Sequence, residues 1–188
     1  MQTLFINACV RPNSRTYDLA SAVLKHLSGE VNEINLEQEK ILPLTSSALA
    51  ARDSLLRSGH LDAPSLKYAK QFASADQIVI AAPYWDLSFP ASLKAFLEAV
   101  TATGITFRYS AQGFPEGLCK AKRLIYVTTA GGPILEYNLG FDYVKALSQL
   151  YYGIPQILCL KAENLDIIGA DVNAILDAAK RTIPTLLK

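Results

Sequence analysis

Three features are scarce in this sequence: cysteine, an excess of charge of one sign, and long apolar runs. The three cysteines, Cys9, Cys119 and Cys159, form no CxxC pair, so no zinc, iron–sulfur or dithiol site is expected. The 18 basic and 17 acidic residues nearly cancel, which gives no electrostatic footprint for nucleic acid. No apolar run approaches the roughly 20 residues that span a bilayer, and the first apolar stretch is too short for a signal peptide. We therefore expect a soluble cytoplasmic protein without membrane or nucleic-acid partners.

What the sequence does contain is an alternation of apolar runs and amphipathic stretches. Hydrophobic residues make up 51% of its 188 residues, which is enough for one α/β core, so we expect a single domain over 1–188. Uncharged apolar runs or apolar–polar alternation predict five strands. These strands are Thr3–Ala8, Val31–Leu36, Gln77–Ala82, Arg123–Thr129 and Gln156–Lys161.

Helical periodicity occupies the segments between and after these strands. It predicts helices over Ser14–Leu27, Ser46–Ala75 with a break near Ser58-Gly59, Pro90–Thr101, Phe141–Tyr152 and Asp171–Leu187. The segment 103–118 is left as an excursion bearing glycine and aromatic residues. Strands that alternate with helices predict a doubly wound parallel sheet with helices on both faces. Five strands of this length favour the flavodoxin-like order 2-1-3-4-5, whose ligands bind at the carboxyl ends of the strands. The loops 9–16, 83–90 and 129–140 are therefore the candidate site.

The first loop, NACVRPNSRT, supplies groups that suit a phosphate. Ser14, Arg15 and Thr16 should open a helix whose free N–H groups and dipole favour an anion, and Arg11 adds a second guanidinium. A plainer interpretation is equally open: Asn13 or Ser14 caps the helix and the arginines are solvated.

The same loop also has the Cys-x5-Arg-Thr spacing of low-molecular-weight cysteine phosphatases, with Cys9 as nucleophile and Arg15 as phosphate ligand. That chemistry needs a ring of inward-pointing N–H groups, and Pro12 lacks one. The Asp-Pro pair that supplies the acid in those enzymes does not occur in this chain. We therefore expect Cys9 to be a small buried side chain.

The second and third loops suggest a flat ring. Tyr84 and Trp85 follow Pro83 at the end of the most apolar strand, where aromatic side chains can line a heteroaromatic ligand or simply join the core. Gly131 and Gly132, in the segment 128–133, let the backbone approach a ligand closely, although a simple turn would explain them too. Together the three loops describe a mononucleotide with a planar ring.

The chain resembles the flavodoxin-like NAD(P)H:quinone oxidoreductases in these loops and in the segment 104–118. The most specific segments of the resemblance are PYWDLSFPASLKAFLE, GITFRYSAQGFPEGL and VTTAGG. The resemblance extends from residue 3 to about 168 and is greatest to the FMN-dependent NADH-azoreductase branch. It implies bound FMN, NADH or NADPH as electron donor, a quinone or azo compound as acceptor, and two-step hydride transfer through flavin N5. No acid–base side chain is obligatory, because the cofactor carries the chemistry. The resemblance also implies a homodimer.

Residue roles follow from the same resemblance. It assigns the phosphate to Ser14, Arg15 and Thr16 with Arg11 nearby, and the pyrimidine end of the ring to Thr129, Ala130, Gly131 and Gly132. The flavin ring is assigned to Pro83, Tyr84, Trp85, Asp86 and Leu87. Tyr109 would border the substrate pocket of the partner subunit. Tyr137 is a candidate proton donor to the acceptor, with an ordinary surface tyrosine as the alternative.

Two positions depart from the family pattern. Asp86 stands where relatives often have Asn, and its carboxylate would repel a reduced, anionic flavin unless it points away. Ala130 replaces an arginine found in some relatives. A flavin-carrying electron-transfer or redox-regulatory protein is the alternative function, although such flavodoxins are typically acidic near the flavin and this chain is nearly neutral.

Overall fold

The computed structural model describes residues 1–39 and 41–188, and its centre is a five-stranded parallel sheet. The strands lie in the order β2-β1-β3-β6-β7, and each neighbouring pair is parallel. Their bounds are β1 (Gln2–Asn7), β2 (Glu30–Asn35), β3 (Gln77–Ala81), β6 (Arg123–Thr129) and β7 (Gln156–Ala162). Counted within this sheet alone, the order is 2-1-3-4-5, so the predicted flavodoxin-like architecture is confirmed.

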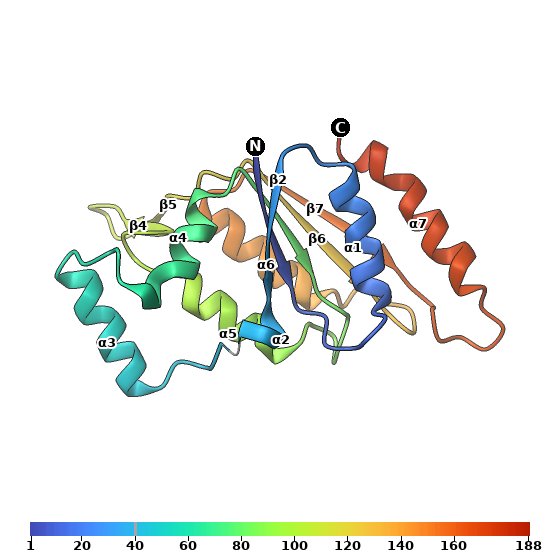
Figure 1. Cartoon of the computed structure of the whole chain (residues 1–188), viewed down its shortest axis with the longest axis horizontal. Coiled ribbons are helices and arrows are strands. Elements are labelled where there is room, and N and C mark those ends of the chain that lie inside the picture. The colour runs from blue at the N-terminus through green and yellow to red at the C-terminus, as the bar shows by residue number, and fades with distance from the viewer. Residues whose placement is uncertain (40) are drawn as a thin grey trace.

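Helices cover both faces of the sheet (Figure 1). α1 and α7 pack against each other on one face, while α4, α5 and α6 contribute to the apolar cluster on the other. The helices are α1 (Arg15–Lys25), α2 (Leu36–Glu39), α3 (Ser46–Arg57), α4 (Lys67–Ser74), α5 (Ala91–Val100), α6 (Leu139–Leu147) and α7 (Val172–Leu186). The predicted pattern of strands alternating with helices is therefore confirmed, with boundaries that differ by a few residues.

Two apolar clusters hold these layers together, one on each face of the sheet. Successive side chains of a strand point to opposite faces. In β3, Val79 accordingly joins the cluster under α1 and α7, whereas Ile78 and Ile80 join the cluster under α4 and α5. All five residues of β3 are buried, which explains why this strand reads as a continuous apolar run.

Two predicted helical regions are more interrupted than the periodicity indicated. In the region 46–75, α3 ends at Arg57, and a 3₁₀ turn at Pro64–Leu66 precedes α4. The break predicted near Ser58-Gly59 is therefore confirmed but longer. The helix predicted over 141–152 begins earlier, at Leu139, and its last turn, Ser148–Tyr152, is π-helical (η2).

The segment 103–118, for which no strand was predicted, forms an antiparallel hairpin of β4 (Phe107–Tyr109) and β5 (Pro115–Gly117). The hairpin packs against η2. The Phe107 ring lies edge-on to Tyr151 with centroids 4.9 Å apart, and the N–H of Cys119 donates to the carbonyl of Tyr152 at 3.3 Å. Tertiary packing therefore defines these two short strands.

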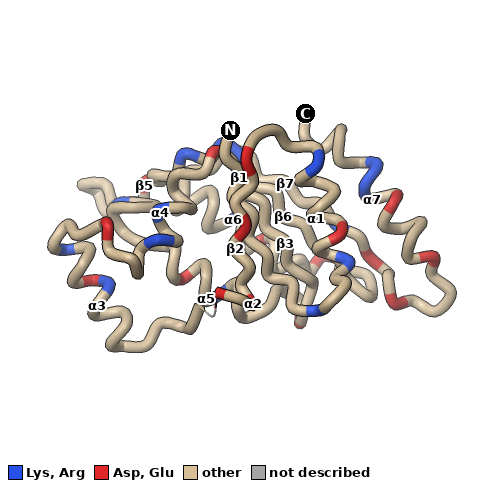
Figure 2. Tube along the Cα trace, viewed as in Figure 1, with Lys and Arg blue, Asp and Glu red and all other residues tan. Residues whose placement is uncertain are grey.

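Basic and acidic residues are interspersed over the described chain (Figure 2). Several form ion pairs between elements, such as Lys180 of α7, whose Nζ lies 2.6 Å from a carboxylate oxygen of Asp18 in α1. This distribution agrees with the near-neutral composition, and among the described residues the two signs of charge are mixed.

Candidate functional site

A pocket of about 410 Å³ lies at the carboxyl ends of β1, β3, β6 and β7. It is lined by residues 10–16, 83–85, 129–131 and 165–166. The first three of these segments belong to the three loops that the sequence singled out. Because parallel strands end at the same edge of the sheet, loops far apart in the chain meet here. The volume falls in the range of small-molecule and cofactor sites.

The amino end of α1 forms the first wall of the pocket. Ser14 caps this helix, with its side-chain oxygen accepting a hydrogen bond from the N–H of Tyr17 at 3.3 Å. The first-turn N–H groups of Arg15 and Thr16 have no partner within the helix, and the helix dipole adds positive potential there. Arg11 is exposed beside this turn, and Asn13 has a left-handed backbone with φ 56°. The capping and anion-binding interpretations are thus compatible, since the capping residue also lines the pocket.

Thr16 joins this wall to the end of β6. It is buried, and its hydroxyl lies 2.6 Å from the hydroxyl of Thr129 at the end of β6. Either hydroxyl can donate, so the pair leaves hydrogen-bonding capacity that a ligand in the pocket can use.

Arg15 is not simply solvated. Its Nη1 donates to Asp166 Oδ1 at 2.6 Å and to the carbonyl oxygen of Leu165 at 3.2 Å. Both acceptors lie in the loop between β7 and α7. The guanidinium therefore bridges α1 to that loop along one side of the pocket.

Pro83, Tyr84 and Trp85 form the second, aromatic wall. The N–H of Tyr84 donates to the carbonyl of Thr129 at 3.0 Å, which extends the pairing of β3 with β6 beyond the strand ends. Trp85 keeps 36% of its surface exposed. Asp86 and Leu87 lie at the tip of a tight turn closed by paired backbone hydrogen bonds between Trp85 and Ser88, outside the residues that line the pocket.

This turn carries backbone strain. Asp86 and Leu87 have φ values of 51° and 65°, in the left-handed region where a side chain costs about 1–2 kcal/mol. Leu87 is also 48% exposed, so replacing it loses little burial. We expect Leu87→Gly to raise the free energy of unfolding of the flavin-free protein by about 0.5–1 kcal/mol in urea titrations.

The matched control for that prediction is Leu42→Gly. Leu42 is exposed, and its φ is not among the positive values of the chain. The control should lower stability slightly, because glycine loses more backbone entropy on folding. A destabilising Leu87→Gly would contradict the strain argument.

The third wall combines Ala130 and Gly131 with the loop after β7. Three backbone N–H groups, of Asn164, Leu165 and Asp166, donate to the carbonyls of residues 132, 130 and 131 at 3.2, 3.2 and 2.9 Å. A side chain on Gly131 would place its Cβ 2.2 Å from Asp166 Oδ2. A side chain at Gly131 would therefore displace the Asp166 carboxylate, while Gly132 lies outside the lining.

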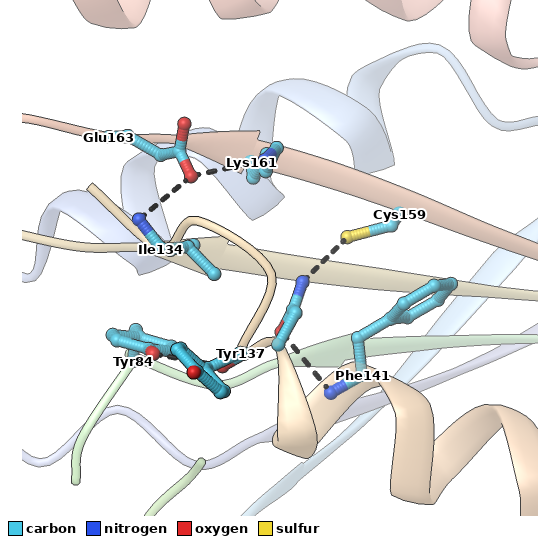
Figure 3. A network of polar contacts seen from close by, with 8 residues as sticks. Tyr84, Ile134, Tyr137, Phe141, Cys159, Lys161 and Glu163 are labelled. Carbon is cyan, nitrogen blue, oxygen red and sulfur yellow. Dashed lines mark hydrogen bonds and ion pairs between the residues drawn. The ribbon is translucent and has the colours of Figure 1, made fainter. Parts of the chain in front are cut away.

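The loop from 132 to 138 is fastened by polar contacts on both sides (Figure 3). The Tyr84 hydroxyl donates to the carbonyl of Tyr137 at 2.9 Å, and the N–H of Ile134 donates to Glu163 Oε1 at 3.0 Å. Asn138 caps α6 through the N–H of Phe141 at 3.3 Å. Tyr137 thus lies beside the aromatic wall, although it does not line the pocket and is 48% exposed.

Cys9 lies in the apolar core of the protein. Its thiol is directed to the carbonyl of Ala81 at 3.8 Å, and only 8% of the residue is exposed. Burial raises the pKa of Cys9 to about 11, so the thiolate that a phosphatase needs is disfavoured. The structure therefore supports the buried, structural interpretation of Cys9.

We expect Cys9→Ser to leave the affinity for the FMN that the sequence resemblance implies, and any turnover with it, within about twofold of wild type. The hydroxyl keeps the small volume of the side chain but is more polar in an apolar cluster, so the free energy of unfolding should fall by about 1 kcal/mol. Flavin titration, steady-state rates and urea unfolding would check this. Loss of turnover with an unchanged fold would assign Cys9 a chemical role.

The structure thus gathers most of the predicted residues around one pocket. Those that line it are Arg11, Ser14, Arg15, Thr16, Pro83, Tyr84, Trp85, Thr129, Ala130 and Gly131. Tyr109 is on the β4–β5 hairpin, with its ring edge-on to Phe107, and lies outside this lining. The sequence analysis did not assign Leu165 and Asp166 to the site, although both lie in the segment KAENLD (161–166), which resembles the family. Their position directly after the fifth strand, at the same sheet edge, is the signal that could have found them.

Two features are absent from the residues that the structure describes. No helix among them is both long and apolar enough to cross a membrane. No group of three or more His, Cys, Asp or Glu side chains within 1–39 and 41–188 is arranged to hold a metal ion.

Comparison with known proteins identifies the family. The profile of a flavodoxin-like fold family matches residues 1–183. The chain is 36% identical over 187 residues to FMN-dependent NADH:quinone oxidoreductase 2 of Clostridium acetobutylicum, which covers 93% of this chain and 92% of the relative. It is 37% identical over 188 residues to the FMN-dependent NADH:quinone oxidoreductase of Lachnoclostridium phytofermentans, covering 95% and 94% of the two chains. The chain belongs to the flavodoxin-like NAD(P)H:quinone oxidoreductase family.

Solved structures of similar proteins share the fold of this quinone oxidoreductase family member. An azoreductase from Bacillus anthracis superposes with a TM-score of 0.84 at 23% identity, over 98% of this chain and 97% of that one. An FMN-dependent NADH-azoreductase from the same species, solved in complex with FMN, gives a TM-score of 0.80 at 19% identity, over 100% and 99%. These structures confirm the fold, and the family resemblance inferred from the sequence motifs is confirmed by the family profile and the two quinone oxidoreductases above.

Proposed function

We propose that this family member is an FMN-dependent NADH:quinone oxidoreductase that also accepts azo compounds, acting as a single domain over 1–188 in the cytoplasm. The observation that carries the proposal is the pocket itself, where an anion-binding helix end faces an aromatic wall at one sheet edge. This donor set fits a cofactor with a phosphate at one end and a planar ring at the other.

The phosphate would be held at the amino end of α1. The first-turn N–H groups, the hydroxyls of Ser14 and Thr16, and the exposed guanidinium of Arg11 are the donors available to it. Arg15 lines the same end, although in the structure its guanidinium is engaged by Asp166.

The flavin ring would be held between the aromatic and glycine-bearing walls. Tyr84 and Trp85 supply flat surface, and Thr129, Ala130 and Gly131 supply backbone groups and little bulk. Gly132, Asp86 and Leu87 complete these loops at their outer ends. FMN held there would supply the redox chemistry, the transfer of a hydride between the nicotinamide and the acceptor. The residues of this chain position the rings and exclude water, so no catalytic side chain is required.

The substrate pocket would be completed by a second copy of the chain. Tyr109, Phe114, Leu118 and Leu150 are exposed apolar residues on or near the β4–β5 hairpin, and such residues suit a dimer interface. Tyr109 would then border the partner's pocket, with Tyr137 beside the chain's own Tyr84. Sedimentation of the purified protein at twice the monomer mass supports this arrangement, and a monomer at micromolar concentration contradicts it.

The test of the proposed function is spectroscopic. The purified protein, loaded with FMN, should be yellow, lose its colour on adding NADH, and regain it on adding a quinone or an azo dye under exclusion of oxygen. Parallel rates with NADPH define donor preference. A protein that binds FMN but is not reduced by either nucleotide would instead be an electron-transfer flavoprotein, and one that binds no FMN would refute the proposal.

A further inference from the structure

Asp166 is the only acidic residue among the described residues that line the pocket. Its carboxylate accepts from Arg15 Nη1 at 2.6 Å. Arg15 is the first residue of α1, so it lies at the positive end of the helix dipole. That end favours a bound anion and disfavours a cation. The carboxylate of Asp166 therefore places a negative charge of the protein itself beside the helix end that would hold the phosphate of the cofactor.

The position of Asp166 is fixed by the backbone. Its N–H donates to the carbonyl of Gly131 at 2.9 Å, between similar bonds from Asn164 and Leu165. The absence of a side chain at Gly131 leaves the room that the carboxylate occupies. The loop thus presents Asp166 to Arg15 independently of the ion pair.

The ion pair itself contributes little to folding. The side chains of Arg15 and Asp166 are 41% and 67% exposed, and pairs exposed to this degree stabilise proteins by about 0–1 kcal/mol. The three backbone bonds already hold the loop. Stability therefore does not explain a carboxylate in a pocket whose other charged groups, Arg11 and Arg15, are cationic.

We propose that Asp166 is a positioning residue that holds Arg15 away from the phosphate of FMN and thereby limits the affinity for the cofactor. This inference rests on the proposed function and adds a determinant of cofactor affinity to it. While the Arg15 guanidinium is paired with Asp166, binding of the phosphate depends on the helix end, the hydroxyls of Ser14 and Thr16, and Arg11. Removing the negative charge would leave the carbonyl of Leu165, at 3.2 Å, as the neutral partner of the Arg15 guanidinium, which the charged phosphate would outcompete, and it would remove a repulsion between two anions.

The test compares flavin affinities of flavin-free wild type, Asp166→Asn, Asp166→Glu, Arg15→Ala and the double variant Arg15→Ala/Asp166→Asn. Dissociation constants for FMN and for riboflavin, which lacks the phosphate, are measured by quenching of flavin fluorescence at low and high salt. We expect Asp166→Asn to bind FMN about fivefold more tightly at low salt, with less gain at high salt. Riboflavin affinity should not change, and Asp166→Glu should resemble wild type.

The gain should vanish in the Arg15→Ala background, because the carboxylate acts through that guanidinium. Asp177→Asn is the control for the change in net charge; Asp177 lies on α7, 4.0 Å from Lys180, and should leave FMN affinity unchanged. An unchanged or weaker FMN affinity in Asp166→Asn overturns the inference. So does an equal change for FMN and riboflavin, which would indicate a structural effect. Wild-type protein that binds neither flavin overturns the proposed function instead.

Discussion

Alanine at both Arg11 and Thr16 is expected to weaken the binding of FMN about 100-fold. Arg11 is the exposed guanidinium beside the first turn of α1, and a hydrogen bond to a charged group contributes about 1.5–3 kcal/mol. The Thr16 hydroxyl adds about 1 kcal/mol as a neutral donor. The sum of about 3 kcal/mol corresponds to two decades in the dissociation constant.

Riboflavin separates loss of the phosphate site from general damage to the pocket. Its affinity should change less than about twofold, because it presents no phosphate to either residue. Arg181→Ala with Thr182→Ala, an exposed pair of the same composition on α7, is the matched control and should bind FMN as wild type does. Unchanged FMN affinity in Arg11→Ala/Thr16→Ala would place the phosphate elsewhere.

Gly117→Ala is expected to destabilise the fold by about 3 kcal/mol. An added Cβ at this position would lie 2.2 Å from the backbone nitrogen of Gly153 and 2.4 Å from the carbonyl oxygen of Tyr152. Backbone cannot yield as a side chain can, so the β4–β5 hairpin would have to separate from η2. Overpacking of this kind typically costs 1–3 kcal/mol and occasionally more.

Gly113→Ala provides the comparison for that measurement. Gly113 lies at the tip of the same hairpin with φ 82°, and an added Cβ would meet no atom within 4 Å. Only the left-handed backbone opposes the change, at about 1–2 kcal/mol. In urea unfolding, Gly117→Ala should be clearly less stable than Gly113→Ala. Equal stabilities would show that Gly117 is not in tight contact with the backbone of Tyr152 and Gly153.

The three central strands of the main sheet, β1, β3 and β6, were predictable because they are buried on both faces, and the edge strand β2 was predictable from its alternation of apolar and polar residues. A run such as Gln77–Ala81 is apolar wherever a parallel strand is covered by helices, so its existence and its place in the order follow from local pattern and chain topology. The hairpin was not predictable in this way. Its two strands have three residues each, and Pro115, Glu116 and Gly117 carry no strand pattern, so packing against η2 defines them.

The candidate site divides along similar lines. The rule that ligands bind at the carboxyl ends of parallel strands located the loops at 9–16, 83–90 and 129–140, and the pocket joins parts of all three. The partner of Arg15 could not be predicted from its neighbours in sequence, because Asp166 is 151 residues away. The left-handed turn at Asp86 and Leu87 could not be predicted, because neither position holds the glycine or asparagine that usually indicates such a turn. Without the turn, the position of these two residues outside the pocket lining could not be predicted either.

The raised pKa values of the three thiols, one buried and two partly buried, bear on the quinones that are the proposed acceptors. Quinones are electrophiles that add to thiolates, and a reductase meets them at every turnover. Burial raises the pKa of Cys9 and Cys159 to about 11 and that of Cys119 to about 12. At pH 7 a thiol with a pKa of about 11 is ionised in roughly one molecule in ten thousand. If quinones are the acceptors, as proposed, this low fraction of thiolate slows their covalent addition to the cysteines of the folded chain.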